Sequence, residues 1–129
     1  MIVLELPYPP SVNHYWTHTR RGTFISAKGM AYRQEVQFVL RRAKIFKPLE
    51  GMLELKLKLL PPDKRKRDID NVLKAILDSL AKGGLMRDDN QVKRLGVEMM
   101  EKMDAQGMVI MLAQQIDPHE TITTRSSQV

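Results

Sequence analysis

The segment Met52–Leu60 constrains the fold more than any other part of this sequence. In MLELKLKLL, leucines stand at 53, 55, 57 and 59, and charged residues stand at 54, 56 and 58. Because successive side chains of a strand point to opposite faces of the sheet, the alternation predicts a strand with one buried face and one solvated face. Pro61 and Pro62 then end the strand.

The second strong pattern is an amphipathic helix from Asp68 to Lys82. Its apolar residues recur at helical spacing and share one face: Ile69, Val72, Leu73, Ile76, Leu77 and Leu80. Asp68 is suited to the N-cap, and Gly83-Gly84 supplies the C-terminal stop. Another helix is expected to run from Ser26, as its N-cap, to about Lys44.

The remaining elements carry weaker signals. Strands are expected at residues 1–6, 23–25, 91–102 and 108–116, and the stretch 11–21 has the composition of a loop. The turn Asp104-Ala105-Gln106-Gly107 predicts a hairpin between the last two strands. Together these elements predict an α/β (α+β) fold: a single compact domain with a small mixed β-sheet and two main helices packed on one side. This domain covers residues 1–116, and residues 117–129 form a polar, flexible tail.

Composition narrows the classes of function. The 129 residues include no cysteine, which excludes disulfides, thiolate metal sites and cysteine nucleophiles. No apolar stretch approaches the roughly 18 residues of a membrane helix, and Met1–Pro10 lacks the features of a signal peptide, so a cytoplasmic protein is expected. The 21 Lys and Arg residues exceed the 15 acids and give a net charge of +6, which favours a polyanion such as nucleic acid as the partner.

The candidate chemistry gathers where the second helix pattern begins. The basic run Lys64-Arg65-Lys66-Arg67 directly precedes Asp68 and Asp70. At a helix start, two acids at this spacing can point the same way and hold Mg²⁺, which prefers oxygen ligands. Lys74, one turn after Asp70, is placed to hold a phosphate or stabilise developing charge.

Each of these residues also has a purely structural interpretation. Asp68 can serve only as a helix cap, and Asp70 can complement the helix dipole or pair with Lys74 on the surface. The basic run can be a solvated loop instead of a phosphate clamp. Asp78, on the same stripe, is interpreted as solvated surface, and His14 and His18 as part of a polar loop without zinc.

Asp88 and Asp89 follow the helix and form a turn by composition. The helix of about 15 residues is roughly 22 Å long, so the chain has to return along it before Asp89 can meet Asp68. The spacing alone does not establish such a return.

These motifs together resemble the RusA family of Holliday-junction resolvases. The similarity runs from about Leu4 to Ile116. It rests on PPSVNHY at 9–15, SAKG at 26–29 before Tyr32-Arg33, PPDKRKRDIDNVLKA at 61–75, and DDNQV at 88–92. The central block is long and specific, and the N-terminal block is weaker by itself.

The resemblance implies a homodimeric, Mg²⁺-dependent endodeoxyribonuclease of bacterial or prophage origin. It implies binding to four-way or other branched DNA, and paired symmetric nicks in recombination and repair. By position, Asp68, Asp70 and Asp89 become the metal-binding acids, with Asp88 a close second for the third, and Lys74 becomes a required lysine. It also implies that the turn at Asp89 lies beside the start of the Asp68 helix. No organic cofactor is expected.

Two other classes of function stay open at this point. One is a catalytically degenerate branched-DNA-binding protein of prophage origin, although the full set of acids argues against it. The other is a structural α/β domain whose charges are only surface, which predicts weak DNA binding with little preference for branches.

Overall fold

The alternating segment forms the central strand of the sheet. In a computed structural model, which describes residues 1–101 and 106–117, strand β4 spans Leu53–Leu60. Its four alternating leucines are at most 1% exposed, whereas Lys56 and Lys58 are exposed on the opposite face. The predicted buried face is therefore confirmed, and it forms the middle of the core. The predicted solvated face is correct at Lys56 and Lys58 and wrong at Glu54, which is only 5% exposed because it accepts hydrogen bonds from Arg94 and Gln114 on the neighbouring strands.

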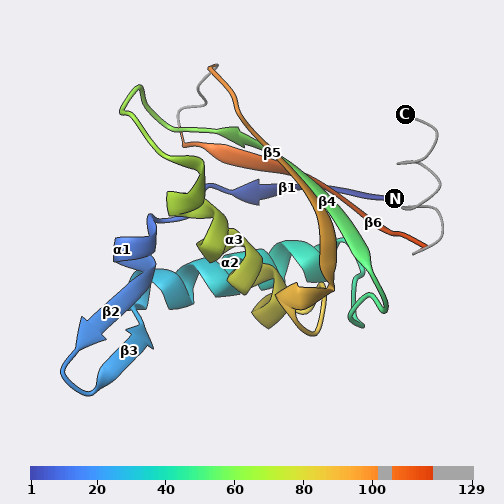
Figure 1. Cartoon of the computed structure of the whole chain (residues 1–129), viewed down its shortest axis with the longest axis horizontal. Coiled ribbons are helices and arrows are strands. Elements are labelled where there is room, and N and C mark those ends of the chain that lie inside the picture. Colours follow the sequence, from blue (N-terminus) through green and yellow to red (C-terminus); the bar gives the residue numbers. More distant parts are fainter. Residues whose placement is uncertain (102–105, 118–129) are drawn as a thin grey trace.

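The four-stranded sheet is mixed and has the order β1-β6-β4-β5. Strand β6 (Met108–Gln115) runs antiparallel to both of its neighbours, β1 (Ile2–Pro7) and β4. Strand β5 (Val92–Met99) runs parallel to β4 and forms an edge of the sheet (Figure 1).

The predicted hairpin between the last two strands is wrong. Strands β5 and β6 do not pair with each other, because β4 lies between them and pairs with both. Residues 104 and 105 of the expected turn lie outside the described residues. A turn signal reports only on neighbouring residues. It could not show that β5 and β6 would each pair with the buried strand β4, which is distant in sequence, instead of with each other.

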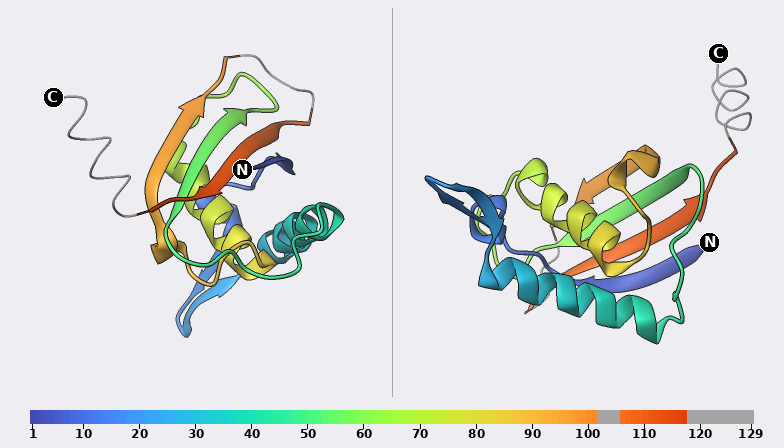
Figure 2. Two further views of the ribbon diagram at one scale, coloured as in Figure 1. Left: turned by 90° about the vertical axis from the view of Figure 1, so that its right-hand side faces the viewer. Right: turned by 90° about the horizontal axis from the view of Figure 1, so that it is seen from below.

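Two long helices cover one face of the sheet, as expected (Figure 2). Helix α2 spans Ala27–Arg42 and helix α3 spans Ile69–Gly83. Helix α3 ends where Gly84 adopts a left-handed conformation with φ of 108°, which a residue without Cβ adopts at little cost. The two helices and the inner face of the sheet enclose the apolar core.

The N-terminal stretch is more ordered than its composition indicated. Instead of a loop over 11–21, the chain forms the short helix α1 (Val12–Tyr15) and strand β2 (Trp16–Thr19). Strand β2 pairs with β3 (Gly22–Ile25) in a separate two-stranded sheet. The fully buried Tyr15 side chain packs in the core and so holds this region against it.

Helix α2 begins where the sequence predicts, because the Ser26 hydroxyl accepts a hydrogen bond of 2.9 Å from the Gly29 amide. Gly29 itself serves close packing. A Cβ atom there would stand 2.4 Å from the Tyr15 carbonyl oxygen and 2.8 Å from Cγ1 of Ile25. Only glycine therefore allows α2 to approach α1 and β3 this closely.

We expect Gly29→Ala to destabilise the fold by about 1–3 kcal/mol, since an overpacked contact against backbone cannot relax by a side-chain movement. Helix propensity alone predicts the opposite sign, a gain of about 1 kcal/mol. Urea unfolding measures the change. Gly96→Ala is the control, because a Cβ at Gly96 meets only Lys56 Cγ at 3.8 Å. Equal stability of the two variants would contradict the close-packing role of Gly29.

Among the described residues, no helix is long and apolar enough to span a membrane. Apart from Asp117, the predicted tail lies outside the described residues.

Candidate nucleic-acid and metal site

The first two candidate acids lie at the exposed start of α3. Asp68 occupies the N-cap position with φ of −86° and ψ of 142°, and Asp70 lies in the first turn. The Asp68 carboxylate makes no capping hydrogen bond, so helix capping does not account for this side chain. Both carboxylates are solvent-accessible and available as oxygen ligands.

Lys74 is exposed one turn along α3 from Asp70. Residues four apart lie on the same face of a helix, so the ammonium group and the Asp70 carboxylate face the same region of solvent. The helix therefore presents a cation and an acid on one exposed face, where the cation can stabilise negative charge on a phosphate.

Asp78 is not the solvated surface residue that the sequence predicts. Its side chain is 21% exposed and pairs with Arg33, whose Nη2 donates to Oδ2 of Asp78 at 2.8 Å. The Tyr15 hydroxyl donates to the same carboxylate oxygen. Asp78 thus connects α1 and α2 to the middle of α3. The helical pattern did not predict this role because the partners of Asp78 are distant in sequence.

The basic run divides into two parts. Lys64, Arg65 and Lys66 are exposed. The Arg67 side chain is only 14% exposed, forms an ion pair of 2.8 Å with Asp63, and lies 5.8 Å from the centre of the Tyr8 ring. Hydrogen bonds from Arg67 and Arg65 hold the pKa of Asp63 well below its usual range. Lys64 and Lys66 are the exposed cations of the run without an ion pair among the described residues, whereas Arg65 is exposed but pairs with Asp63 at 3.1 Å.

A pocket of about 610 Å³ is lined by Arg67 and Asn71, the residues that flank the acid pair, although neither acid lines it. It is bounded by the segment from Tyr8 to Ser11, by α2 residues including Lys28, by the basic run from Arg65 to Arg67, and by Asn71, which follows Asp70. The Tyr8 hydroxyl is buried there without a hydrogen-bond partner in the described part of the chain. Cations and polar groups thus converge next to the candidate acids, a site that sequence patterns did not reveal.

Asp88 and Asp89 begin the short 3₁₀ helix η1 (Asp89–Gln91). The Asp88 carboxylate accepts a 2.9 Å hydrogen bond from the Asn90 amide, which lowers its pKa. The pKa of Asp89 is raised by partial burial and by the nearby carboxylates of Asp88 and Asp78. Asp88 therefore has a capping role, and Asp89 is the acid of the two without one.

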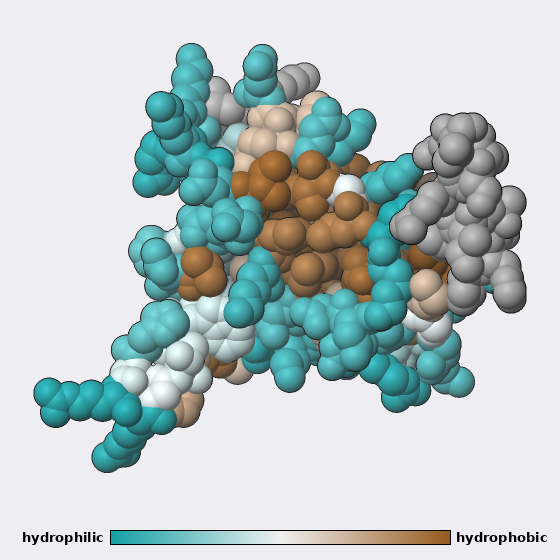
Figure 3. Space-filling view, in the orientation of Figure 1, coloured by the Kyte–Doolittle hydropathy of each residue, from teal (hydrophilic) through white to brown (hydrophobic). Residues whose placement is uncertain are grey.

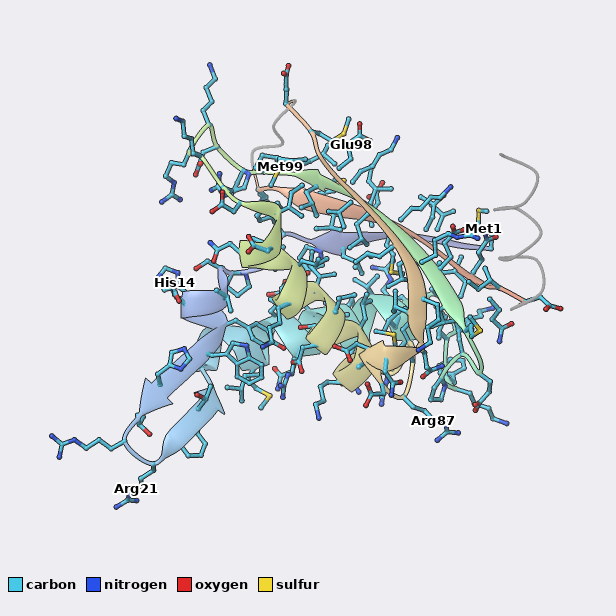
Figure 4. All side chains as sticks on the ribbon, viewed as in Figure 1. Met1, His14, Arg21, Arg87, Glu98 and Met99 are labelled. Carbon is cyan, nitrogen blue, oxygen red and sulfur yellow. The ribbon has the colours of Figure 1, made fainter. Side chains whose placement is uncertain are left out.

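The expected return of Asp89 to the start of α3 is wrong within one chain. Val92, at the end of η1, pairs with Leu53 at the beginning of β4, whereas the Asp68 segment follows the end of β4. The eight residues of β4 separate these two ends by about 26 Å. Figure 4 shows Arg87 and Met99 at opposite ends of β5.

The three acids consequently do not meet in a single chain. Among residues 1–101 and 106–117, no group of three or more potential ligands from His, Asp and Glu is placed to hold a metal ion. The position that the resemblance implied for Asp89 fails within one chain because the parallel pairing of β5 with β4 carries Asp89 to the far end of α3.

An uncovered apolar surface connects these two ends. Leu95 and Ile69 are 39% and 38% exposed, and Figure 3 shows the apolar area between α3 and β5. Leu95 pairs with Leu55, so it points to the same side of the sheet as the helices, yet no helix within residues 1–101 and 106–117 covers it. We call this area the α3–β5 apolar surface; its other members are Leu73, Leu77, Val97 and Met99.

Comparison with known proteins indicates the same family as the sequence motifs do. The model of the family described as Endodeoxyribonuclease RusA matches residues 7–113. A protein of Enterobacteria phage HK97, named crossover junction endodeoxyribonuclease rusA, is 44% identical over 86 residues, which are 67% of this chain and 72% of that protein. Proteins of the same name from Shigella sonnei and Escherichia coli K12 are 42% and 40% identical over 89 residues, which are 69% of this chain and 74% of each relative.

Proposed function

Since the chain belongs to the RusA family, we propose that it is a Holliday-junction resolvase that nicks branched DNA. Phosphodiester hydrolysis is the chemistry that its exposed groups suit. The observation that carries the proposal is the acid pair Asp68 and Asp70 at the open start of α3, bordered by the exposed cations Lys64, Arg65 and Lys66. This segment lies inside the part of the chain that matches the family.

The donor set fits Mg²⁺. The cation prefers one or two carboxylates together with water and substrate phosphate, and the exposed carboxylates of Asp68 and Asp70 provide such oxygens. Bound there, Mg²⁺ would polarise the scissile phosphate and favour hydroxide as the nucleophile. The positive end of the α3 dipole opposes a cation, so a third carboxylate strengthens the site.

Lys74 has a separate role in this proposal. Its exposed ammonium group, on the same face as Asp70, binds a phosphate oxygen and stabilises the negative charge that develops during cleavage. Because Asp70 lies one turn before Lys74 on the same face, the Lys74 ammonium group is on the side of the helix that the basic run precedes.

A homodimer supplies the third carboxylate. The α3–β5 apolar surface leaves Leu95 and Ile69 more than a third exposed, and a second copy of the chain can cover it. A two-fold axis across this surface, at right angles to α3, reverses the direction of the second copy. The partner's Asp89 then lies beside Asp68 and Asp70, and the same contact forms at the other end.

Two such composite sites suit the substrate. A four-way junction has near two-fold symmetry, and a symmetric dimer presents one site to each of two opposed strands. The exposed cations of the basic run bind the backbone next to each site, where they offset the repulsion between aspartates and phosphates.

The test is a cleavage assay on a synthetic four-way junction with Mg²⁺, beside a linear duplex of matched sequence. We expect paired incisions at symmetric positions of the junction and none in the duplex. Cleavage of both substrates would replace the resolvase by a less selective nuclease at the same site. Tight junction binding without cleavage would favour the degenerate binding protein.

A further inference from the structure

The β2–β3 hairpin projects away from the body of the molecule. Figures 1 and 4 show it extending beyond α1, with Arg21 at its tip. Its strands belong to a sheet of their own, and every residue from Thr17 to Phe24 is exposed. An isolated two-stranded hairpin is marginal in water, so packing does not explain why the chain keeps one here.

The tip carries more positive charge than the turn requires. Arg20 and Arg21 form the two-residue connection, which usually favours Gly, Asn or Asp. Here the positive φ of 133° falls on Gly22, and the Thr19 hydroxyl accepts a 3.2 Å hydrogen bond from the Arg21 amide. Thr19 and Gly22 thus close the turn, and neither arginine side chain is needed to close it.

The base of the hairpin is held rigidly against the helices. The Ser26 hydroxyl donates to the Tyr15 carbonyl at 3.0 Å, and the Tyr15 hydroxyl is hydrogen-bonded to Ser79 in α3 at 3.0 Å. The Arg33 guanidinium lies 5.7 Å from the centres of both the Tyr15 and Trp16 rings. The direction of the hairpin is therefore fixed relative to α3, and hence to Asp70.

Positive and polar groups continue from the hairpin to the acid pair. No acid occurs between Trp16 and Ile25. His14, directly before the hairpin base, lines the pocket together with Lys28, Lys66 and a single acid, Glu35. A polyanion that lies over this pocket thus meets the basic run at one end and the arginine tip at the other.

We propose that the β2–β3 hairpin is a DNA-contacting arm whose tip, Arg20 and Arg21, binds backbone phosphates of the duplex arm that flanks the cleavage site. This inference rests on the proposed function, because it takes branched DNA as the partner. Strands of four residues place the tip about 13 Å from the hairpin base. The contact is therefore distinct from the scissile phosphate, and phosphate contacts set position and affinity without reading sequence.

The test is the salt dependence of junction binding in EDTA, where cleavage cannot occur, for wild-type protein and for Arg20→Ala/Arg21→Ala. Each phosphate contact contributes about 0.9 to the slope of log K against log salt. Because the proposed dimer presents two such tips with two arginines each, we expect the double variant to lower this slope by about 2 to 4. Hydroxyl-radical footprinting should show that two symmetric protected patches, one on each of two opposed junction arms, are lost.

Arg41→Ala/Lys47→Ala is the matched control, because it removes the same charge from two exposed positions, one in the last turn of α2 and one in the loop that follows it. A slope and a footprint that change no more for the hairpin variant than for this control would overturn the arm. Failure of the proposed nuclease function can be told apart from failure of the hairpin proposal. If wild-type protein binds junctions but never cuts them, the nuclease function is refuted. An altered slope for the hairpin variant would still support the DNA-contacting arm. Wild-type protein that binds no DNA overturns both.

Discussion

Asp70→Asn is expected to lower Mg²⁺-dependent cleavage of a four-way junction by about 10³-fold or more. The amide keeps the size of the side chain but removes the negative charge that holds the cation, and a bound metal contributes several kcal/mol of transition-state stabilisation. Junction affinity should persist or increase slightly, because one acid fewer faces the DNA backbone. Single-turnover cleavage and a binding titration in EDTA measure the two effects separately.

Glu5→Gln is the matched control for this change. It removes one carboxylate from an exposed position on β1, an edge strand of the sheet. Its cleavage rate should equal that of the wild type. A normal rate for Asp70→Asn as well would refute the metal site, and lost binding would mean that Asp70 acts through the fold.

Mixing two inactive variants should restore cleavage if the site is shared between protomers. Asp70→Asn alone and Asp89→Asn alone each disable both sites of their own dimer. In a mixed dimer, both substitutions fall in one site, and the other site combines an intact Asp70 with the partner's Asp89. Random exchange makes half of the dimers mixed, so about a quarter of the sites recover. The expected product is a single nick, in place of the paired nicks of the wild type.

The control mixture combines Asp70→Asn with Asp68→Asn. These residues lie together at the start of α3, so no mixed dimer contains an intact site and cleavage should stay absent. If the Asp70→Asn and Asp89→Asn mixture is equally inactive after subunit exchange, then Asp89 does not complete the site across a dimer. The result is informative because Asp89 lies far from Asp68 within one chain.

The sequence by itself predicted the elements whose periodicity is strong and local. The alternation in β4 and the apolar face of α3 both appear as expected, because a half-buried strand or helix has to repeat with the period of its own backbone. The acid pair and the exposed part of the basic run were also identifiable from their order along the chain, since neighbours at a helix start share one local conformation.

Only the tertiary structure decided which distant segments meet. Strand β5 joined β4 in parallel instead of pairing with β6, and this choice carried Asp89 to the far end of α3. Asp78 became a partly buried partner of Arg33 and Tyr15. Strand β2 formed in a stretch that looked like a loop, and it pairs with the strand that the sequence predicted at 23–25. Each of these outcomes depends on competition among long-range contacts for the same apolar surface or polar partner, which no local periodicity records.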